Sequence, residues 1–136
     1  MMQKYSVLMS VYSKENPEYL KQAMDSIQRQ TVPTDDFVLV CDGPLNEPLD
    51  SVIAAKQQEM GETLNVVRLT KNGGLGNALN KGIKHCKNEL VARMDSDDIA
   101  YLDRCEKQMV IFNTQPEVSI CSGIVEEFTS DPNIVD

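Results

Sequence analysis

Residues 5–11 read YSVLMSV and are followed by Asn16 and Pro17. A short, nearly continuous apolar run is typical of a strand that is buried on both faces. Asn is favoured as an N-cap and Pro at the first helical position, so a helix is predicted to begin at Pro17. That helix carries one apolar stripe at spacings of three and four: Leu20, Ala23, Met24 and Ile27. The stretch predicts a buried strand leading into a helix packed on a sheet.

The same alternation of strand and helix recurs to the end of the chain. Further strands are predicted at 37–41, 64–69, 90–94 and 118–126, and further helices at 49–60, 75–86 and 102–112. Strands separated by helices of this length imply right-handed crossovers. The fold class is therefore predicted to be α/β, with a mostly parallel sheet covered by helices on both faces.

Size and composition are those of one folded domain. The chain has 136 residues, 41% hydrophobic and 25% charged, which suits a single core. Its net charge of −8 disfavours a nucleic-acid partner, because such proteins concentrate Lys and Arg. No apolar run is long enough to span a membrane, so we expect a cytoplasmic chain. The cysteines lack metal-ligand spacing and are expected to be reduced core residues.

In open parallel sheets, ligands bind beyond the carboxyl ends of the strands. Four segments directly follow predicted strands and should share one rim: Ser10 to Tyr12, Asp42-Gly43, Lys71 to Gly76, and Asp95 to Asp98. If the chain stays extended, Asp95 and Asp97 point to the same side and can approach one Mg²⁺ or Mn²⁺ ion. Helix capping by this acidic cluster is the other interpretation, and the spacing alone leaves both open.

Asp42 and the Asn72-Gly73-Gly74 turn each have two interpretations. Asp42 suits a turn before Gly43, and its place at the rim also suits an unpaired carboxylate that accepts a hydrogen bond from a base or ribose. The glycines allow a tight turn before a helix, and free N–H groups there could approach an anion. We favour the turn as the primary role of the glycines. The single histidine, His85, is assigned no role.

Several segments together resemble a known family. They are YSVLMSVY (5–12), SIQRQT (26–31), VLVCDG (38–43), KNGGLGNALNKGI (71–83) and ARMDSDDIAYLDR (92–104). In this order and spacing they resemble the family 2 glycosyltransferases of the GT-A fold, especially those that build bacterial surface polysaccharides. The resemblance extends from Tyr5 to Phe128. SIQRQT and Asp42 alone are weak signals, whereas DSDD placed after NGGLGNALN is a strong one.

The resemblance implies a function for the rim. It implies the Rossmann-like, nucleotide-sugar-binding half of an enzyme that transfers a sugar, UDP-linked in most members, to an acceptor hydroxyl with inversion. Asp42 would read the base, Asp95 would lie near the ribose, and Asp97 would bind Mg²⁺ or Mn²⁺, with Asp95 as a further metal ligand. The full set implied to line the nucleotide-sugar site is Ser10, Val11, Tyr12, Asp42, Asn72, Gly73, Gly74, Asp95 and Ser96.

The resemblance also implies what lies outside this sequence. The family's general base normally lies well downstream of the DxD motif, in the acceptor-binding half, so residues 1–136 are interpreted as one GT-A-type domain truncated before that part. The expected acceptor is a saccharide or a lipid-linked saccharide, and the full-length protein would sit at the inner face of the membrane. A nucleotide-binding module without catalysis is the alternative. A sugar-nucleotide pyrophosphorylase is disfavoured, because the loop after the first strand is not glycine-rich.

Overall fold

A parallel sheet forms the centre of the molecule. The computed structural model describes residues 4–97, 99–100 and 105–106. Within them the sheet has four strands in the order β3-β2-β1-β4, and each neighbouring pair is parallel. The strands are β1 (Tyr5–Val11), β2 (Asp36–Cys41), β3 (Leu64–Arg68) and β4 (Leu90–Asp95). These bounds agree with the predicted strands to within one residue.

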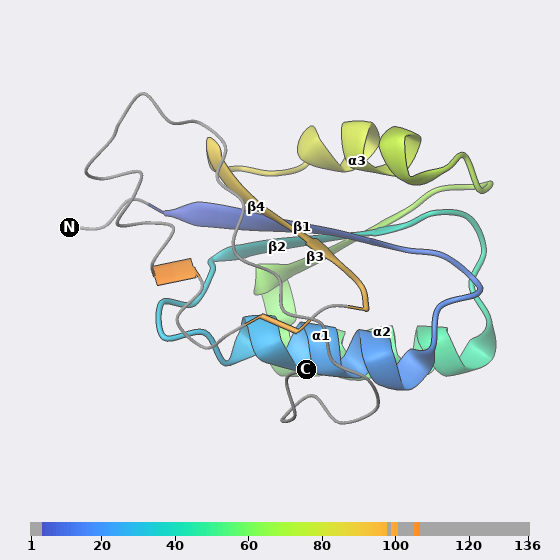
Figure 1. The fold of residues 1–136 in the computed structure, drawn as a ribbon, viewed down its shortest axis with the longest axis horizontal. Coiled ribbons are helices and arrows are strands. Elements are labelled where there is room, and N and C mark those ends of the chain that lie inside the picture. Colours follow the sequence, from blue (N-terminus) through green and yellow to red (C-terminus); the bar gives the residue numbers. More distant parts are fainter. Residues whose placement is uncertain (1–3, 98, 101–104, 107–136) are drawn as a thin grey trace, which may run out of the picture.

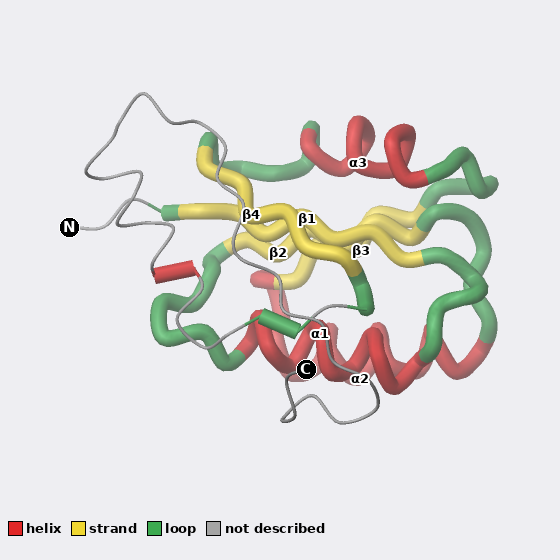
Figure 2. The backbone as a smooth tube through the Cα atoms, viewed as in Figure 1, coloured by secondary structure: helices red, strands yellow, loops and turns green. Residues whose placement is uncertain are grey.

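Helices cover both faces of this sheet, as Figures 1 and 2 show. Helices α1 (Pro17–Gln28) and α2 (Glu47–Met60) lie on one face, and α3 (Leu75–Ile83) lies on the other. A short 3₁₀ turn, η1 (Gly61–Thr63), follows α2. The predicted mostly parallel α/β fold is confirmed. Of the helix predicted at 102–112, Cys105 and Glu106 are helical; its other residues, and the strand predicted at 118–126, lie outside the described residues.

The larger core lies between the sheet and helices α1 and α2. All of β2 is buried, and β1 is buried except for Ser10, as expected for strands covered on both faces. The predicted stripe of α1 is buried in full. Asn16 caps α1 by accepting a hydrogen bond from the Glu18 N–H. The predicted start of α1 at Pro17 is therefore confirmed.

Helix α3 differs from its prediction. It ends at Ile83, so His85 and Cys86 lie in the turn that follows. Its first and last apolar residues, Leu75 and Ile83, are exposed, and contact with the sheet is made through Ala78 and Gly82. A side-chain carbon on Gly82 would lie 2.5 Å from Val40 and 2.6 Å from Leu8. The helix therefore packs closely on the sheet at Gly82, and of its larger apolar residues Leu79 packs, partly buried, against the same core.

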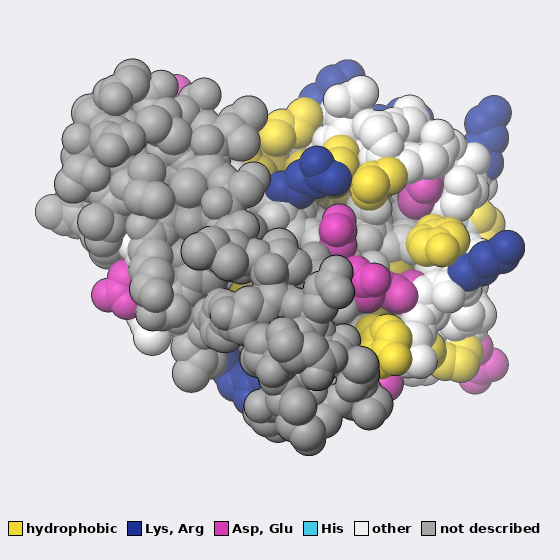
Figure 3. All heavy atoms as spheres, viewed as in Figure 1, with side chains coloured by type: hydrophobic (Ala, Val, Ile, Leu, Met, Phe, Trp, Pro, Cys, Tyr) yellow, Lys and Arg dark blue, Asp and Glu magenta, His cyan; other side chains and the backbone are white. Residues whose placement is uncertain are grey.

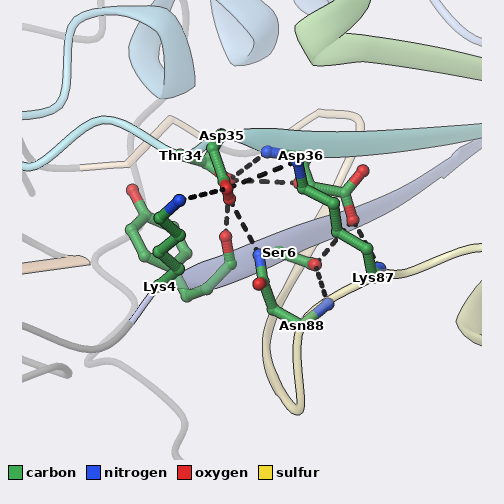
Figure 4. Close-up of polar contacts among 8 residues, drawn as sticks. Lys4, Ser6, Thr34, Asp35, Asp36, Lys87 and Asn88 are labelled. Atoms are coloured by element: carbon green, nitrogen blue, oxygen red, sulfur yellow. Dashed lines mark hydrogen bonds and ion pairs between the residues drawn. The ribbon is translucent and has the colours of Figure 1, made fainter.

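A polar network joins the amino ends of β1 and β2 to the turn before β4 (Figure 4). The buried Ser6 hydroxyl donates to the buried Asp36 carboxylate at 2.6 Å. The same carboxylate accepts from the Lys87 N–H at 2.8 Å, and the Ser6 oxygen accepts from the Asn88 N–H at 3.2 Å. Buried polar groups need such partners. The network therefore holds the amino ends of β1 and β2 and the turn before β4 in fixed positions relative to one another.

Asp35, at the exposed side of this network, carries a lowered pKa. Burial acts to raise the pKa of Asp35, but hydrogen bonds from Asn88 and Lys87, and the charges of Lys87 and Lys4, outweigh it. The carboxylate is therefore ionised at neutral pH, and its contribution to stability is lost as pH falls below the ordinary value of 3.8.

The last turn of α1 and the residues just after it also hold the chain that follows the acidic segment. The Ser26 hydroxyl accepts from the Ala100 N–H at 3.0 Å, and the Gln30 side chain accepts from the Cys105 N–H at 2.9 Å. Thr31 donates to Glu106 at 2.9 Å. The weak sequence signal SIQRQT (26–31) therefore has a structural reason, because its polar residues bind backbone and side chains about 75 positions later.

Replacing Ser6 tests the network. We expect Ser6→Ala to lower the free energy of unfolding by about 1–3 kcal/mol, because Asp36 and the Asn88 N–H each lose a buried partner. Urea unfolding followed by circular dichroism measures the change. Ser51→Ala, at an exposed serine of α2, is the control and should stay within about 0.5 kcal/mol of the unaltered chain. Equal stability of both variants would contradict the network's role.

Candidate functional site

The carboxyl ends of three neighbouring strands meet at one edge. The register pairs Ser10 of β1 with Asp95 of β4, and Val11 with Cys41 of β2. Beyond the strands, the Asp42 N–H continues the ladder to the Val11 carbonyl at 2.8 Å. The structure therefore brings together the segments that the sequence placed on one rim, as far as they are described.

The last two residues of β1 and the residue after it differ in how exposed they are. Tyr12 is 47% exposed and Ser10 is half-buried. Val11 is buried, and its carbonyl already accepts from Asp42. The side chain of Val11 therefore belongs to the core, while Ser10 and Tyr12 reach the surface of the rim.

Asp42 is buried and hydrogen-bonded to the glycine turn. Its two carboxylate oxygens accept from the Gly73 N–H at 2.9 Å and the Gly74 N–H at 3.1 Å. Of the two interpretations left open by the sequence, the one with an unpaired carboxylate and free amides does not hold within the chain, because these groups bind each other. The reason is the approach of residues 71–74 to the end of β2, which local sequence does not reveal. Asp42 thus anchors the turn that starts α3.

Two glycines make this approach possible. Gly43 has φ +92°, and a side-chain carbon there would lie 2.6 Å from the Asn72 nitrogen. Gly74 is the N-cap of α3 with φ +93° and has no side-chain cap. Both backbone conformations favour glycine strongly. Positive φ before the helix, which was expected of the glycines, is found at Gly74 and not at Gly73.

The acidic segment alternates between exposed and buried residues. Asp95 ends β4 and is exposed, Ser96 is buried, and Asp97 is exposed. The Ser96 hydroxyl donates to the Glu15 carboxylate at 2.5 Å, across 81 positions of sequence. Figure 3 shows acidic side chains among hydrophobic and basic ones on the face that it draws. Asp98 lies outside the described residues.

Glu15 is a rim residue that the sequence analysis did not select. It lies between β1 and α1, and its second oxygen accepts from the Asn16 N–H at 3.0 Å. The rule that polar residues after a strand share one rim would have included it if the first loop had been followed beyond Tyr12. Its partner Ser96 could not have been identified from local sequence.

The donor set at Asp95 and Asp97 fits a divalent cation only in part. Two exposed carboxylates separated by one residue are hard oxygen ligands, and Mg²⁺ commonly takes one or two carboxylates with substrate phosphates and water. In the part of the chain that the structure describes, no cluster of three or more His, Cys, Asp or Glu residues could hold a metal. The remaining ligands of such an ion would have to come from a bound ligand or solvent.

Cys41 lies directly before Asp42 but is not a candidate nucleophile. Burial raises the pKa of its thiol to about 11, although the charge of Arg68 opposes the shift. Burial likewise raises the pKa of Cys86 to about 11. Cys41, Cys86 and Cys105 are free thiols, and Cys41 and Cys105 are buried. The neutral thiol is a weak nucleophile, so Cys41 serves the core.

Comparisons with known proteins agree on one family. The model described as "Glycosyl transferase family 2" matches residues 6–135. The amylovoran biosynthesis glycosyltransferase AmsE of Erwinia amylovora is 44% identical over 91% of this chain and 46% of its own length. An Escherichia coli protein, UDP-Gal:alpha-D-GlcNAc-diphosphoundecaprenol beta-1,3-galactosyltransferase, is 39% identical over 95% of this chain and 46% of its own length. The chain thus spans about half the length of these curated relatives.

A solved structure agrees with the fold. The crystal structure of S. aureus TarS 1-349 in complex with UDP-GlcNAc matches with a TM-score of 0.71 and 26% sequence identity. The match covers 84% of this chain and 32% of that one. No helix among the described residues is both long enough and apolar enough to cross a membrane.

The anchoring role of Asp42 can be tested without a ligand. In Asp42→Ala the Gly73 and Gly74 N–H groups lose their acceptors, and we expect their hydrogen exchange to accelerate by about tenfold or more. Exchange measured by NMR on the folded chain gives the rates. Asp50→Ala, which removes an exposed aspartate paired with Arg68, should leave both rates unchanged. Unchanged exchange in Asp42→Ala would show that the turn holds itself.

The raised thiol pKa also has a measurable consequence. A rise from 9.0 to about 11 lowers the thiolate fraction of Cys41 roughly a hundredfold at pH 8, so iodoacetamide should modify it slowly in the folded chain and readily in urea. Mass spectrometry of the peptides measures this. Because the pKa is raised on folding, the stabilising effect is complete below pH 9.0 and is lost as pH rises towards 11. Equal labelling of folded and unfolded Cys41 would contradict the assignment.

Proposed function

The chain belongs to glycosyl transferase family 2, and on this basis we propose that it forms the donor-binding part of an enzyme that transfers a sugar from a nucleoside-diphosphate sugar to an acceptor hydroxyl. The observation that carries the proposal is the position of Asp95-Ser96-Asp97. The segment ends β4 and lies opposite Ser10 at the carboxyl edge of a parallel sheet. Ligands of open α/β folds bind at that edge.

A UDP-linked donor is the nucleotide sugar that the relatives favour. The E. coli relative is named for UDP-Gal, and the TarS structure contains UDP-GlcNAc. The base of the donor would lie beside Tyr12, whose exposed ring is near the end of β1. Asn72, Gly73 and Gly74 would border the same site, with Gly73 and Gly74 held in place by Asp42.

Asp42 can anchor the turn and recognise the nucleoside at once. A carboxylate has about four lone-pair directions, and the two amides use one on each oxygen. The remaining lone pairs of Asp42 could accept a hydrogen bond from a base N–H or a ribose hydroxyl. In this proposal the contact with the turn orients the carboxylate, so base recognition needs no rearrangement of residues 71–74.

Asp95 and Asp97 would provide the acidic pair of the DxD motif. Asp95 would lie near the ribose and cation, and Asp97 would bind Mg²⁺ or Mn²⁺, with diphosphate oxygens and water as the other ligands. When bound, such a cation neutralises negative charge on the departing diphosphate. The two exposed aspartates supply oxygen ligands, while the buried Ser96 between them binds Glu15 instead of the solvent.

None of the residues described above is proposed to bind the acceptor or to act as the general base. The relatives are about twice as long as the matched region, and we place the acceptor site and the general base in the part that corresponds to their remainder. The names of those relatives favour a role in bacterial polysaccharide synthesis with a lipid-linked saccharide acceptor. We further propose that the transfer inverts the anomeric centre, as the family resemblance implies.

Calorimetric titration with UDP tests the donor site. We expect UDP to bind in the presence of Mn²⁺, and Asp97→Asn to weaken this binding by at least about tenfold, because one negatively charged cation ligand is lost. Glu89→Gln is the matched control. It removes one carboxylate beside β4 at the opposite end of the strand, where the side chain is exposed, and should leave UDP binding unchanged.

The outcomes separate donor binding from its alternatives. Binding of GDP in place of UDP would keep the donor site and change the base. The cation would be removed from the proposal if the affinity for UDP were the same with and without Mn²⁺ and the same in Asp97→Asn as in the unaltered chain. If the chain binds neither nucleotide under either condition, the donor-site proposal fails.

A further inference from the structure

Glu15 is held in one position at the start of α1. Its backbone N–H donates to the Tyr12 carbonyl at 3.1 Å, and its Oε2 accepts from the Asn16 N–H at 3.0 Å. The loop is also tied to the start of α2, since the Asn46 side chain donates to the Ser13 carbonyl at 2.9 Å. Asn16 itself caps α1. The half-buried Glu15 carboxylate therefore projects from a loop that is fixed on both sides.

The other Glu15 oxygen meets the acidic segment. Oε1 accepts from the Ser96 hydroxyl at 2.5 Å, and Ser96 is only 7% exposed although its neighbours Asp95 and Asp97 are exposed. Hydrogen bonds to an ionised carboxylate are short and stronger than neutral ones. A part-buried hydrogen bond from Glu15 thus acts on the residue between the two carboxylates.

Glu15 does not act as a third ligand for the cation in this arrangement. Among the residues that the structure describes, Glu15, Asp95 and Asp97 do not come together as a group that could hold a metal. Both Glu15 oxygens already accept hydrogen bonds within the protein. The Glu15 carboxylate instead accepts a hydrogen bond from the Ser96 hydroxyl.

We propose that Glu15 is a positioning residue, which holds Ser96 inward and thereby fixes Asp95 and Asp97 towards the cation and diphosphate of the donor. The inference rests on the proposed function, and it adds a residue from the first loop to the DxD segment. Without this hydrogen bond, the segment after β4 would lose conformational entropy when the cation and nucleotide bind, and this loss would oppose binding. Affinity for UDP with Mn²⁺ would therefore fall, whereas any cation-independent affinity would not.

The test compares Glu15→Ala, Glu15→Gln and Ser96→Ala by titration with UDP, with and without Mn²⁺. We expect Glu15→Ala and Ser96→Ala each to weaken Mn²⁺-dependent binding of UDP by about tenfold. A double variant that carries both substitutions should bind UDP about as tightly as either single variant, because both remove the same hydrogen bond. Glu15→Gln keeps a carbonyl acceptor and should stay within about threefold of the unaltered chain. Glu18→Ala, which removes an exposed acid in the first turn of α1, is the matched control and should bind normally.

Circular dichroism and urea unfolding establish which variants are folded. If Glu15→Ala unfolds, Ser96→Ala still tests the proposal, because it removes the same hydrogen bond from the other side, and normal binding by folded Ser96→Ala would overturn it. A tenfold loss confined to Mn²⁺-dependent binding, with rescue by Gln, would support positioning. Additive losses in the double variant would overturn it. So would normal binding by folded Glu15→Ala, and that result would leave the donor site intact. Absence of Mn²⁺-dependent UDP binding by the unaltered chain would overturn both proposals together.

Discussion

The hydrogen bond between Ser6 and Asp36 sets the frame on which the candidate site depends. Both groups are buried at the amino ends of β1 and β2, and backbone N–H groups of Lys87 and Asn88 complete the contact just before β4. A buried carboxylate is costly without donors, so these segments are held in one relation to one another. A slip of one residue would move a strand by about 3.3 Å and turn its side chains to the other face.

That register has its effect at the opposite edge of the sheet. It places Ser10 beside Asp95, and Val11 beside Cys41, so that loops distant in sequence start from neighbouring points. Each described loop is then secured by a polar side chain from another segment: Asp42 for the glycine turn, Glu15 for Ser96, and Ser26 for Ala100. A rigid GT-A scaffold that carries separately anchored loops suits a binding site that must hold a flexible diphosphate.

Much of this fold could be predicted from sequence because its signals are local. The apolar runs of β1 and β2, the Asn16 cap and the stripe of α1 are properties of a few consecutive residues, and the structure has them as predicted. The position of α3 was only partly predictable, since Gly82 determines how closely the helix packs and leaves Leu75 and Ile83 exposed. Asp42 and Glu15 find partners 31 and 81 positions away, which no local pattern encodes.

The acidic residues at the rim form two groups, which differ in whether protein groups compensate their negative charge. Asp42 and Glu15 each have both oxygens paired with donors from the protein, so their charge is compensated by the fold itself. Asp95 and Asp97 stay exposed to water. A carboxylate whose two oxygens both accept hydrogen bonds from the protein gains less from a cation than a solvated carboxylate, which exchanges water for the cation. In the proposed donor site, Asp95 and Asp97 would be open to a ligand from solution, while the buried Asp42 and the half-buried Glu15 hold neighbouring segments in place.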